Sequence, residues 1–171
     1  MDQIAPQPSC LTALHGVWLA DLAEIPSPGG SVLHMVRRDS PLFSGFGEIY
    51  FSLVEPGEVK AWKRHRRQTQ LFAVPHGLME VAVHDPREDS PSRGLSSFFL
   101  LGRQGHYKLL RIPPGLWYGF ACRGEDTAVL ANCADLPHDP AEAERMPPDS
   151  AAIPCRLRGG PLEAGPAGKR A

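Results

Sequence analysis

The chain has 171 residues and a formal net charge of −1, the balance of 18 Lys and Arg against 19 Asp and Glu. This length suits one domain with a core of its own. The near-neutral charge excludes a general affinity for nucleic acid or for an anionic membrane surface. Eighteen prolines and 17 glycines argue against long helices and favour short strands joined by turns.

Short strands are predicted along most of the chain, because apolar residues alternate with polar ones or form brief runs between turns. In chain order these strands cover residues 15–25, 31–39, 48–54, 59–62, 69–74, 78–85, 95–102, 107–113, 113–122 (after an initial turn) and 127–134. In the strand 78–85, Met79, Val81 and Val83 share one face, and Ala82 and His84 share the other.

One helical turn is predicted, at residues 139–145, with Asp139 as its N-cap and Pro140 at its first helical position. Closely spaced strands with so little helix predict an antiparallel sandwich or barrel, and a two-sheet jelly roll fits the length. The domain is expected to span residues 15–155, after an N-terminal arm at 1–14. The Gly- and Pro-rich residues 156–171 are expected to form a flexible tail.

The N-terminus has no basic segment followed by an apolar stretch, and no apolar run approaches the ~20 residues of a membrane span. A soluble cytoplasmic protein without a membrane partner is therefore expected. The cysteines match no CxxC pattern, and Cys122 and Cys133 lie in apolar runs, so they are interpreted as small buried thiols in a reducing compartment.

A stripe of positive charge, "KAWKRHRR", precedes an apolar strand. Its spacing follows the first cupin motif, whose metal ligands are His, His and Glu; here Lys63 replaces the first His, His65 keeps the second, and Gln70 replaces the Glu. In the second cupin motif, which begins at "PPG", the His and Asn positions hold Tyr118 and Cys122. A lysine ammonium repels a cation, so no metal ion or other cofactor is expected. The stripe is interpreted as an anion-binding surface of a metal-free barrel.

The chain is similar to the dTDP-4-dehydrorhamnose 3,5-epimerases and related dTDP-sugar isomerases, which are metal-free cupins. The similarity lies in "GEVKAWKRHRRQTQLFAVPHGLMEVAVHDPREDSPSRG", "LLRIPPGLWYGFAC" and "NCADLPHDPAEAERMPPD". It implies an all-β, cupin-type antiparallel jelly-roll barrel with a short helical turn near the C-terminus. It also implies a homodimeric enzyme of carbohydrate biosynthesis that epimerises or isomerises a dTDP-linked 4-keto sugar by removing a proton next to the ketone.

This chemistry needs a base, an acid on the opposite face of the sugar and a cation near the enolate oxygen. The resemblance places the family's base position at Lys63 and a preceding cation at Lys60. His65 shares a strand face with Lys63, whose ammonium would keep the imidazole neutral, so His65 is the predicted base. Tyr118 or Lys63 is the predicted acid or enolate stabiliser, and Asp149 is the predicted residue that orients the base.

Further residues are predicted to bind the substrate. The diphosphate contacts are assigned to Lys60, Arg66 and Arg67, although Lys60 reaches the face of Lys63 only if a bulge lies between them. The other assigned substrate-binding residues are Gln70, His76, His84, Trp117 and His138. Two of these assignments stay open, because His84 faces either the barrel or solvent, and "WY" at 117–118 is either core or a platform for stacking a base or sugar.

Two other functions fit the same residues. A cupin that has lost its chemistry would keep the pocket and bind a sugar nucleotide or a small anion. The stretch "KRHRRQTQ" also resembles the dTDP-sugar 3,4-ketoisomerases, with His65, Arg66 and Gln70 in register.

Overall fold

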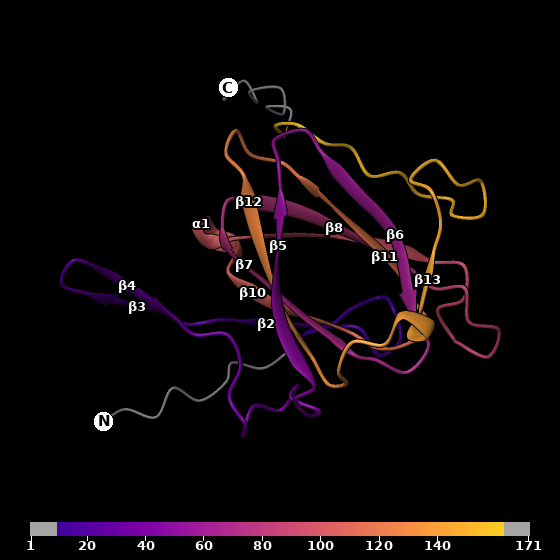
Figure 1. Ribbon diagram of the computed structural model, residues 1–171, viewed down its shortest axis with the longest axis horizontal. Coiled ribbons are helices and arrows are strands. Elements are labelled where there is room, and N and C mark those ends of the chain that lie inside the picture. The colour runs from indigo at the N-terminus through magenta and orange to yellow at the C-terminus, as the bar shows by residue number, and fades with distance from the viewer. Residues whose placement is uncertain (1–9, 163–171) are drawn as a thin grey trace, which may run out of the picture.

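The computed structural model describes residues 10–162, which form two antiparallel sheets around a common core (Figure 1). One sheet has the strand order β1 (Cys10–Leu11), β2 (Trp18–Asp21), β10 (Lys108–Ile112), β7 (Gln70–His76), β12 (Ala128–Ala134) and β5 (Glu48–Val54). The other has the order β13 (Ala143–Arg145), β6 (Val59–His65), β11 (Trp117–Cys122), β8 (Leu78–His84) and β9 (Ser96–Gly102). The predicted all-β jelly-roll barrel is confirmed.

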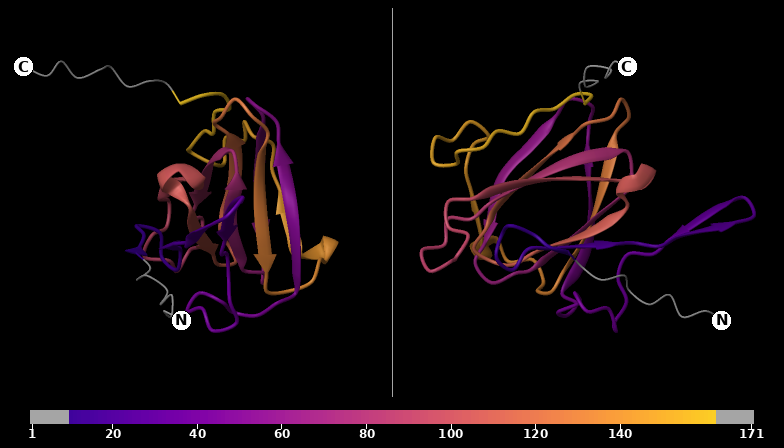
Figure 2. Two further views of the ribbon diagram at one scale, coloured as in Figure 1. Left: turned by 90° about the vertical axis from the view of Figure 1, so that its left-hand side faces the viewer. Right: turned by 180° about the vertical axis from the view of Figure 1, so that it is seen from behind.

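A separate hairpin projects away from the barrel, as Figure 2 shows from behind. It consists of β3 (Glu24–Ser27) and β4 (Gly30–Leu33), and the chain reverses at Gly29, whose φ of 83° suits glycine. The sequence predicted single strands at 15–25 and 31–39. The structure divides the first between β2 and β3, and it ends the second at Leu33.

The predicted helical turn near the C-terminus is present but short. Asp139 caps it by accepting a hydrogen bond from the Ala141 N–H at 2.9 Å. The turn, η1 (Pro140–Glu142), is a 3₁₀ helix, and the chain then extends into β13, which pairs with β6. A second short element that the sequence did not predict, α1 (Arg103–His106), connects β9 to β10.

The main core lies between the two sheets. Phe72 of β7 contacts Tyr118 and Phe120 of β11 edge-on, with ring centroids 5.2 and 6.1 Å apart. Met79, Val81 and Val83 face this core, whereas Ala82 faces outward, so the alternation predicted for this strand is confirmed. Cys122 and Cys133 are buried free thiols, also as predicted.

The outer face of the five-stranded sheet is covered by residues 146–157, here called the C-terminal strap. Ile153 of the strap is fully buried against Trp62, Ala82 and Trp117. Beyond the strap, the Gly160 N–H donates to the Cys122 carbonyl at 3.0 Å. The outer parts of the predicted arm and tail, 1–9 and 163–171, lie outside the described residues. No helix in the described part of the chain is long and apolar enough to cross a membrane.

Candidate active site

A cavity of about 650 Å³ lies between the sheets, on the side bounded by β5, β6, β11 and β13. Its volume is within the usual range of small-molecule sites. Its polar lining comes from both sheets and from the chain between β12 and β13, and consists of Glu48, Tyr50, Ser52, Lys60, Lys63, Tyr118, His138 and Arg145. Its apolar lining includes Phe72, Phe120 and Leu130. A mixture of aromatic and charged groups of this kind suits a polar ligand with a flat or ring-shaped part.

Two lysines reach this cavity because β6 carries a bulge. Lys63 lies opposite Tyr118 of β11, yet Lys60, three residues back, pairs only two residues further along β11. Gly119 makes room for this irregularity, since an added Cβ there would lie 2.5 Å from the Cβ of Ala61. The bulge that the sequence required between the two lysines is present.

The environment of Lys63 disfavours its ammonium form. Burial lowers the pKa of Lys63, the positive charge of Arg145 lowers it further, and Glu48 partly offsets both effects. The amine of Lys63 therefore becomes neutral at a lower pH than a free lysine amine. In neutral form it can accept a proton, and once protonated it places a positive charge inside the cavity.

His65 follows Lys63 on the same face of β6 but does not line the cavity. Its side chain is 5% exposed, and neither ring nitrogen has a hydrogen-bond partner among the described residues. The ring stacks parallel to Tyr118 at a centroid distance of 6.1 Å. Burial and then the charge of Lys63 lower the pKa of His65 to about 4. The imidazole is therefore neutral at pH 7, in the direction that the sequence predicts.

Two tyrosines line the cavity from opposite sheets, Tyr118 from β11 and Tyr50 from β5. Burial raises the pKa of Tyr118 well above its ordinary value, and the nearby Tyr50 adds to the effect. Burial also raises the pKa of Tyr50, while the side-chain amide of Asn132 partly lowers it. Both phenols are therefore protonated, and able to donate a proton, at neutral pH.

β5 presents its polar face to the cavity and its apolar face to the surroundings. The residues that line the cavity from this strand are Glu48, Tyr50 and Ser52. The residues between them point away from the barrel, and Ile49, Phe51 and Leu53 are 50%, 60% and 57% exposed. This is the reverse of the usual pattern in a half-buried strand.

Arg145 lines the cavity from β13, and His138 is brought to it by the chain between β12 and β13. Its position is set by Glu142, whose buried carboxylate accepts hydrogen bonds from the N–H groups of Arg67 and Gln68 at 2.5 and 2.6 Å. Hydrogen bonds to a charged carboxylate are strong. Burial alone would raise the pKa of Glu142, but these two N–H donors and the Arg67 side chain outweigh it, so the pKa is lowered. The backbone of Arg67 and Gln68, directly after β6, therefore anchors the chain that closes the cavity.

Of the residues that the sequence assigned, the structure brings four to the cavity surface, namely Lys60, Lys63, Tyr118 and His138. His65 lies behind Tyr118. The remaining assigned residues lie elsewhere. They are Arg66, Arg67, Gln70, His76, His84, Trp117 and Asp149.

The residues away from the cavity have other partners. Arg66 binds Glu144, and the guanidinium of Arg67 binds Glu142. His84 faces the outer side of the five-stranded sheet and lies 2.9 Å from the Ser96 hydroxyl, so the open question about its direction is resolved.

Trp117 belongs to the outer cluster beneath the strap, with the Arg64 guanidinium 4.7 Å above its ring. Asp149 is exposed in the strap, and His76 is exposed at the end of β7. Gln70 is buried in a chain of side-chain amides behind the cavity.

No family model matches the chain. The probable low-salt glycan biosynthesis epimerase Agl13 of Haloferax volcanii is 32% identical over 140 residues, which cover 80% of this chain and 89% of that protein. The crystal structure of a dTDP sugar isomerase from Desulfovibrio desulfuricans G20 is 54% identical, with a TM-score of 0.84 over 85% of this chain and 93% of that one. The chain belongs to the dTDP-sugar epimerase and isomerase family. The family is one of enzymes, so the cavity is its candidate active site.

The dTDP-4-dehydrorhamnose 3,5-epimerase of Bacillus anthracis str. Ames, crystallised with TDP and PPi, shares the fold at 16% identity, with a TM-score of 0.74 over 90% of this chain and 93% of that one. Within the described residues, no group of three or more His, Cys, Asp or Glu side chains is arranged to hold a metal ion.

Sequence reasoning missed four polar residues that line this cavity, namely Glu48, Tyr50, Ser52 and Arg145. One signal was available for three of them, because polar residues at 48, 50 and 52 alternate with large apolar ones and had to face one side of β5. Nothing local indicated that this polar side faces the barrel. Arg145 was hidden by its assignment to a helical turn, whereas its strand pairing with Lys63 places the two residues side by side.

Proposed function

We propose that this protein removes the proton next to the ketone of a dTDP-linked 4-keto sugar, as the first step of an epimerisation or isomerisation. The observation that carries the proposal is the pair of lysines which the β6 bulge turns into the cavity, one of them with a lowered pKa. A cavity with an accessible amine and a cationic wall suits both an α-proton and the oxygen anion that its removal creates. The 54% identical relative is a dTDP sugar isomerase, which supports this substrate class.

Lys63 is proposed as the base, in place of His65. Lys63 lines the cavity, whereas the ring nitrogens of His65 are buried and its ring lies behind Tyr118. A neutral Lys63 amine takes the α-proton, and the electron pair of the broken C–H bond forms the enolate. The resulting ammonium then faces the enolate oxygen, which it stabilises. His65 is proposed to fix the tilt of the Tyr118 ring by stacking on it.

The diphosphate contacts are proposed to come from Lys60 and Arg145. Both line the cavity and are exposed, so they can reach a ligand that enters from solvent. The sequence assignment to Arg66 and Arg67 is less favourable, because Glu144 and Glu142 already bind these guanidinium groups. A new anion would have to compete with those carboxylates.

The proposal is tested by following deuterium uptake from D2O into a dTDP-4-keto-6-deoxyhexose by NMR. Lys63→Met should slow exchange by about 100- to 1000-fold, the loss typical for one group that acts on a developing oxyanion. Lys108→Met is the matched control, because Lys108 lies on β10 outside the cavity and forms an ion pair with Asp21 of β2. If Lys63→Met exchanges the proton at the parental rate and His65→Asn does not exchange it, then His65 is the base, as the sequence predicted.

The substrate class has a separate test. Millimolar dTDP should raise the melting temperature, because a ligand that binds only the folded state stabilises it. Inorganic phosphate should raise it less if the nucleotide contributes contacts of its own. An unchanged melting temperature with dTDP would contradict the nucleotide-sugar proposal. The NMR product then separates an epimer from a shifted ketone, since both reactions begin with the same enolate.

We further propose that the protein is a homodimer whose subunits meet at β5. This strand is the edge of the six-stranded sheet, and its outward side chains Ile49, Phe51 and Leu53 are apolar and exposed. A two-fold axis in front of the outer face of β5 would pack these side chains of one subunit against the same side chains of the other, and so bury both apolar faces. Phe51→Glu should produce a monomer in light scattering, and a wild-type monomer at micromolar concentration would contradict the proposal. The buried free thiols fit a reducing compartment such as the cytoplasm.

A further inference from the structure

Tyr50 occupies a position that the reaction needs and that the lysines cannot fill. It lines the cavity from β5, in the six-stranded sheet, whereas Lys63 lines it from β6, in the five-stranded sheet. A sugar between the two sheets would have the amine on one side and the phenol on the other. Inversion at a carbon requires that the proton leaves from one face and returns to the opposite face.

Behind Tyr50 lies a row of buried side-chain amides. Asn132 is the direct cross-strand partner of Tyr50 in the pairing of β5 with β12. The Asn132 Nδ2 donates to Gln70 Oε1 at 2.6 Å, the Gln70 Nε2 donates to Gln68 Oε1 at 2.8 Å, and the Gln68 Nε2 donates to the Leu136 carbonyl at 2.6 Å. All three amides are buried, so each bond is protected from competing water.

The donor and acceptor in each hydrogen bond of this row are fixed by the Leu136 carbonyl at its end. A backbone carbonyl can only accept, so Gln68 must turn its NH2 group toward Leu136 and its oxygen toward Gln70. The same reasoning makes Gln70 present its oxygen to Asn132. The Asn132 oxygen is held independently, because the Leu71 N–H donates to it at 3.3 Å. Asn132 then has one amide hydrogen left to donate, and its cross-strand partner Tyr50 is a neighbour whose phenol oxygen can accept it.

This bond polarity decides what Tyr50 can do. The Asn132 amide lowers the pKa of Tyr50, which is the effect of a donor directed at the phenol oxygen. With its oxygen turned toward this amide, the phenol would keep its own hydrogen free for the cavity. Burial raises the pKa of Tyr50 overall, so this hydrogen is present at neutral pH.

We propose that Tyr50 is the proton donor on the wall opposite Lys63, and that the amide row Gln68–Gln70–Asn132 is the positioning device that directs its hydroxyl into the cavity. This inference rests on the proposed function. The C–H bond breaks toward Lys63, which becomes an ammonium, and the enolate carbon takes the proton of Tyr50 on its other face as the ketone re-forms. Tyr50 is left as a phenolate, and solvent returns its proton and removes that of Lys63.

The test separates exchange from inversion. In D2O, Tyr50→Phe should still exchange the α-proton on the face of the base, while inversion falls by about 100-fold or more. Tyr107→Phe is the matched control, since its hydroxyl donates to the His34 carbonyl away from the cavity. Inversion at the parental rate in Tyr50→Phe, with its loss in Tyr118→Phe, would overturn the assignment in favour of the other cavity tyrosine.

The amide row is tested without relying on activity. The chain has 3 tyrosines, so each Cζ signal of ¹³C-labelled tyrosine can be assigned with the Tyr→Phe variants. Asn132→Leu should shift the Tyr50 signal and leave Tyr107 unchanged, and it should reduce inversion more than exchange. An unshifted Tyr50 signal would overturn the positioning role. A wild-type protein that exchanges no α-proton would instead refute the proposed function and the donor role with it, while the NMR result would still decide the amide row.

Discussion

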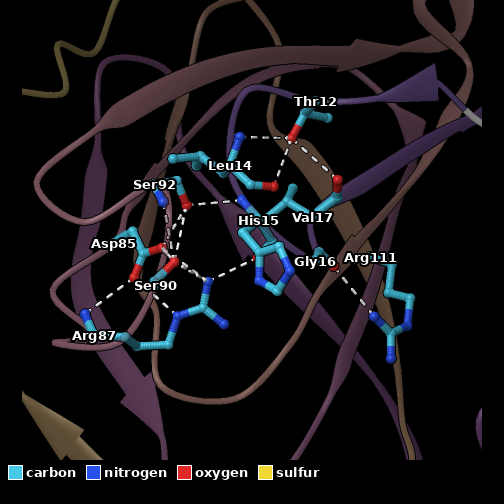
Figure 3. Close-up of polar contacts among 10 residues, drawn as sticks. All are labelled: Thr12, Leu14, His15, Gly16, Val17, Asp85, Arg87, Ser90, Ser92 and Arg111. Atoms are coloured by element: carbon cyan, nitrogen blue, oxygen red, sulfur yellow. Dashed lines mark hydrogen bonds and ion pairs between the residues drawn. The ribbon is translucent and has the colours of Figure 1, made fainter.

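Two polar clusters in this barrel differ in how completely their groups are paired. The first is the loop after β8, where the buried Asp85 accepts hydrogen bonds from the Arg87 guanidinium and from the Ser90 and Ser92 hydroxyls at 2.5–2.9 Å (Figure 3). Arg87 and Ser92 also bind the backbone of His15, which ties the loop to the start of β2. Every oxygen of this carboxylate has a partner from its own chain.

The second cluster is the cavity, and its groups are left open. Within the described residues, Lys63 forms no ion pair, and neither ring nitrogen of His65, which lies behind Tyr118 of the cavity wall, has a partner. A buried polar group without a partner costs stability, and proteins keep such groups mainly where a ligand completes them. A closed network therefore supports the fold, whereas an open one indicates where the substrate binds. Four predictions test this distinction.

The largest effect is expected in the closed cluster. Asp85→Ala removes the acceptor of the Arg87 guanidinium and both serine hydroxyls, and should lower the free energy of unfolding by about 3 kcal/mol. Urea titration measures the change, with Asp89→Ala, an exposed aspartate of the same loop, as the control. The kcat of the folded fraction should stay near that of the wild type. A large loss of kcat in fully folded Asp85→Ala would mean that this loop takes part in the chemistry.

A smaller loss is expected at the bulge that turns both lysines inward. Gly119→Ala places a methyl group where Ala61 already lies, and should cost about 2 kcal/mol through overpacking. It should also reduce activity, because the displacement moves Lys60 relative to Lys63. Gly124→Ala is the control, since an added Cβ there meets only atoms at 3.8 Å or more. Equal stability of the two variants would show that the bulge is not tightly packed.

The two clusters should also respond to acid in different pH ranges. The pKa of His65 falls from 6.5 to about 4 on folding, so the unfolded chain binds the proton first and stability decreases as pH falls from 6.5 toward 4. The pKa of Asp85 is also lowered in the folded state, by Arg87 and the two serines, so its contribution is lost only below the ordinary aspartate range. His65→Gln should remove the first decrease alone. Thermal unfolding at stepped pH checks this, and an unchanged curve would place His65 in a solvated site.

The smallest effect is expected on the outer face of the stripe. Arg66→Gln removes an exposed ion pair with Glu144 and should change stability by less than about 0.5 kcal/mol. The KM should also stay unchanged, because the guanidinium points away from the cavity lining. A clear rise in KM would restore the diphosphate role that the sequence assigned to this arginine.

The barrel was largely predictable, because its strands alternate regularly and end at Gly and Pro turns. The bulge in β6 was also anticipated, since two lysines three residues apart cannot otherwise share a face. The orientation of β5 was not predictable from its own residues, because periodicity separates two faces without saying which is inside. From the local sequence, Ile49, Phe51 and Leu53 would be expected to face the core. They face outward instead, because the polar residues of β5 line the cavity and β5 is the edge strand of its sheet.

Asn132 was equally out of reach, because its role depends on cross-strand pairing with a residue far away in the chain. The same pairing has a consequence for synthesis on the ribosome. β5 emerges early, yet its neighbour in the sheet is β12, which is translated much later. Until then the nascent chain carries an apolar strand with no partner on either edge, a segment prone to pairing with another chain. The wall that holds Tyr50 is therefore among the last parts to form, and a chaperone that shields residues 48–54 during translation would protect both the yield and the active site.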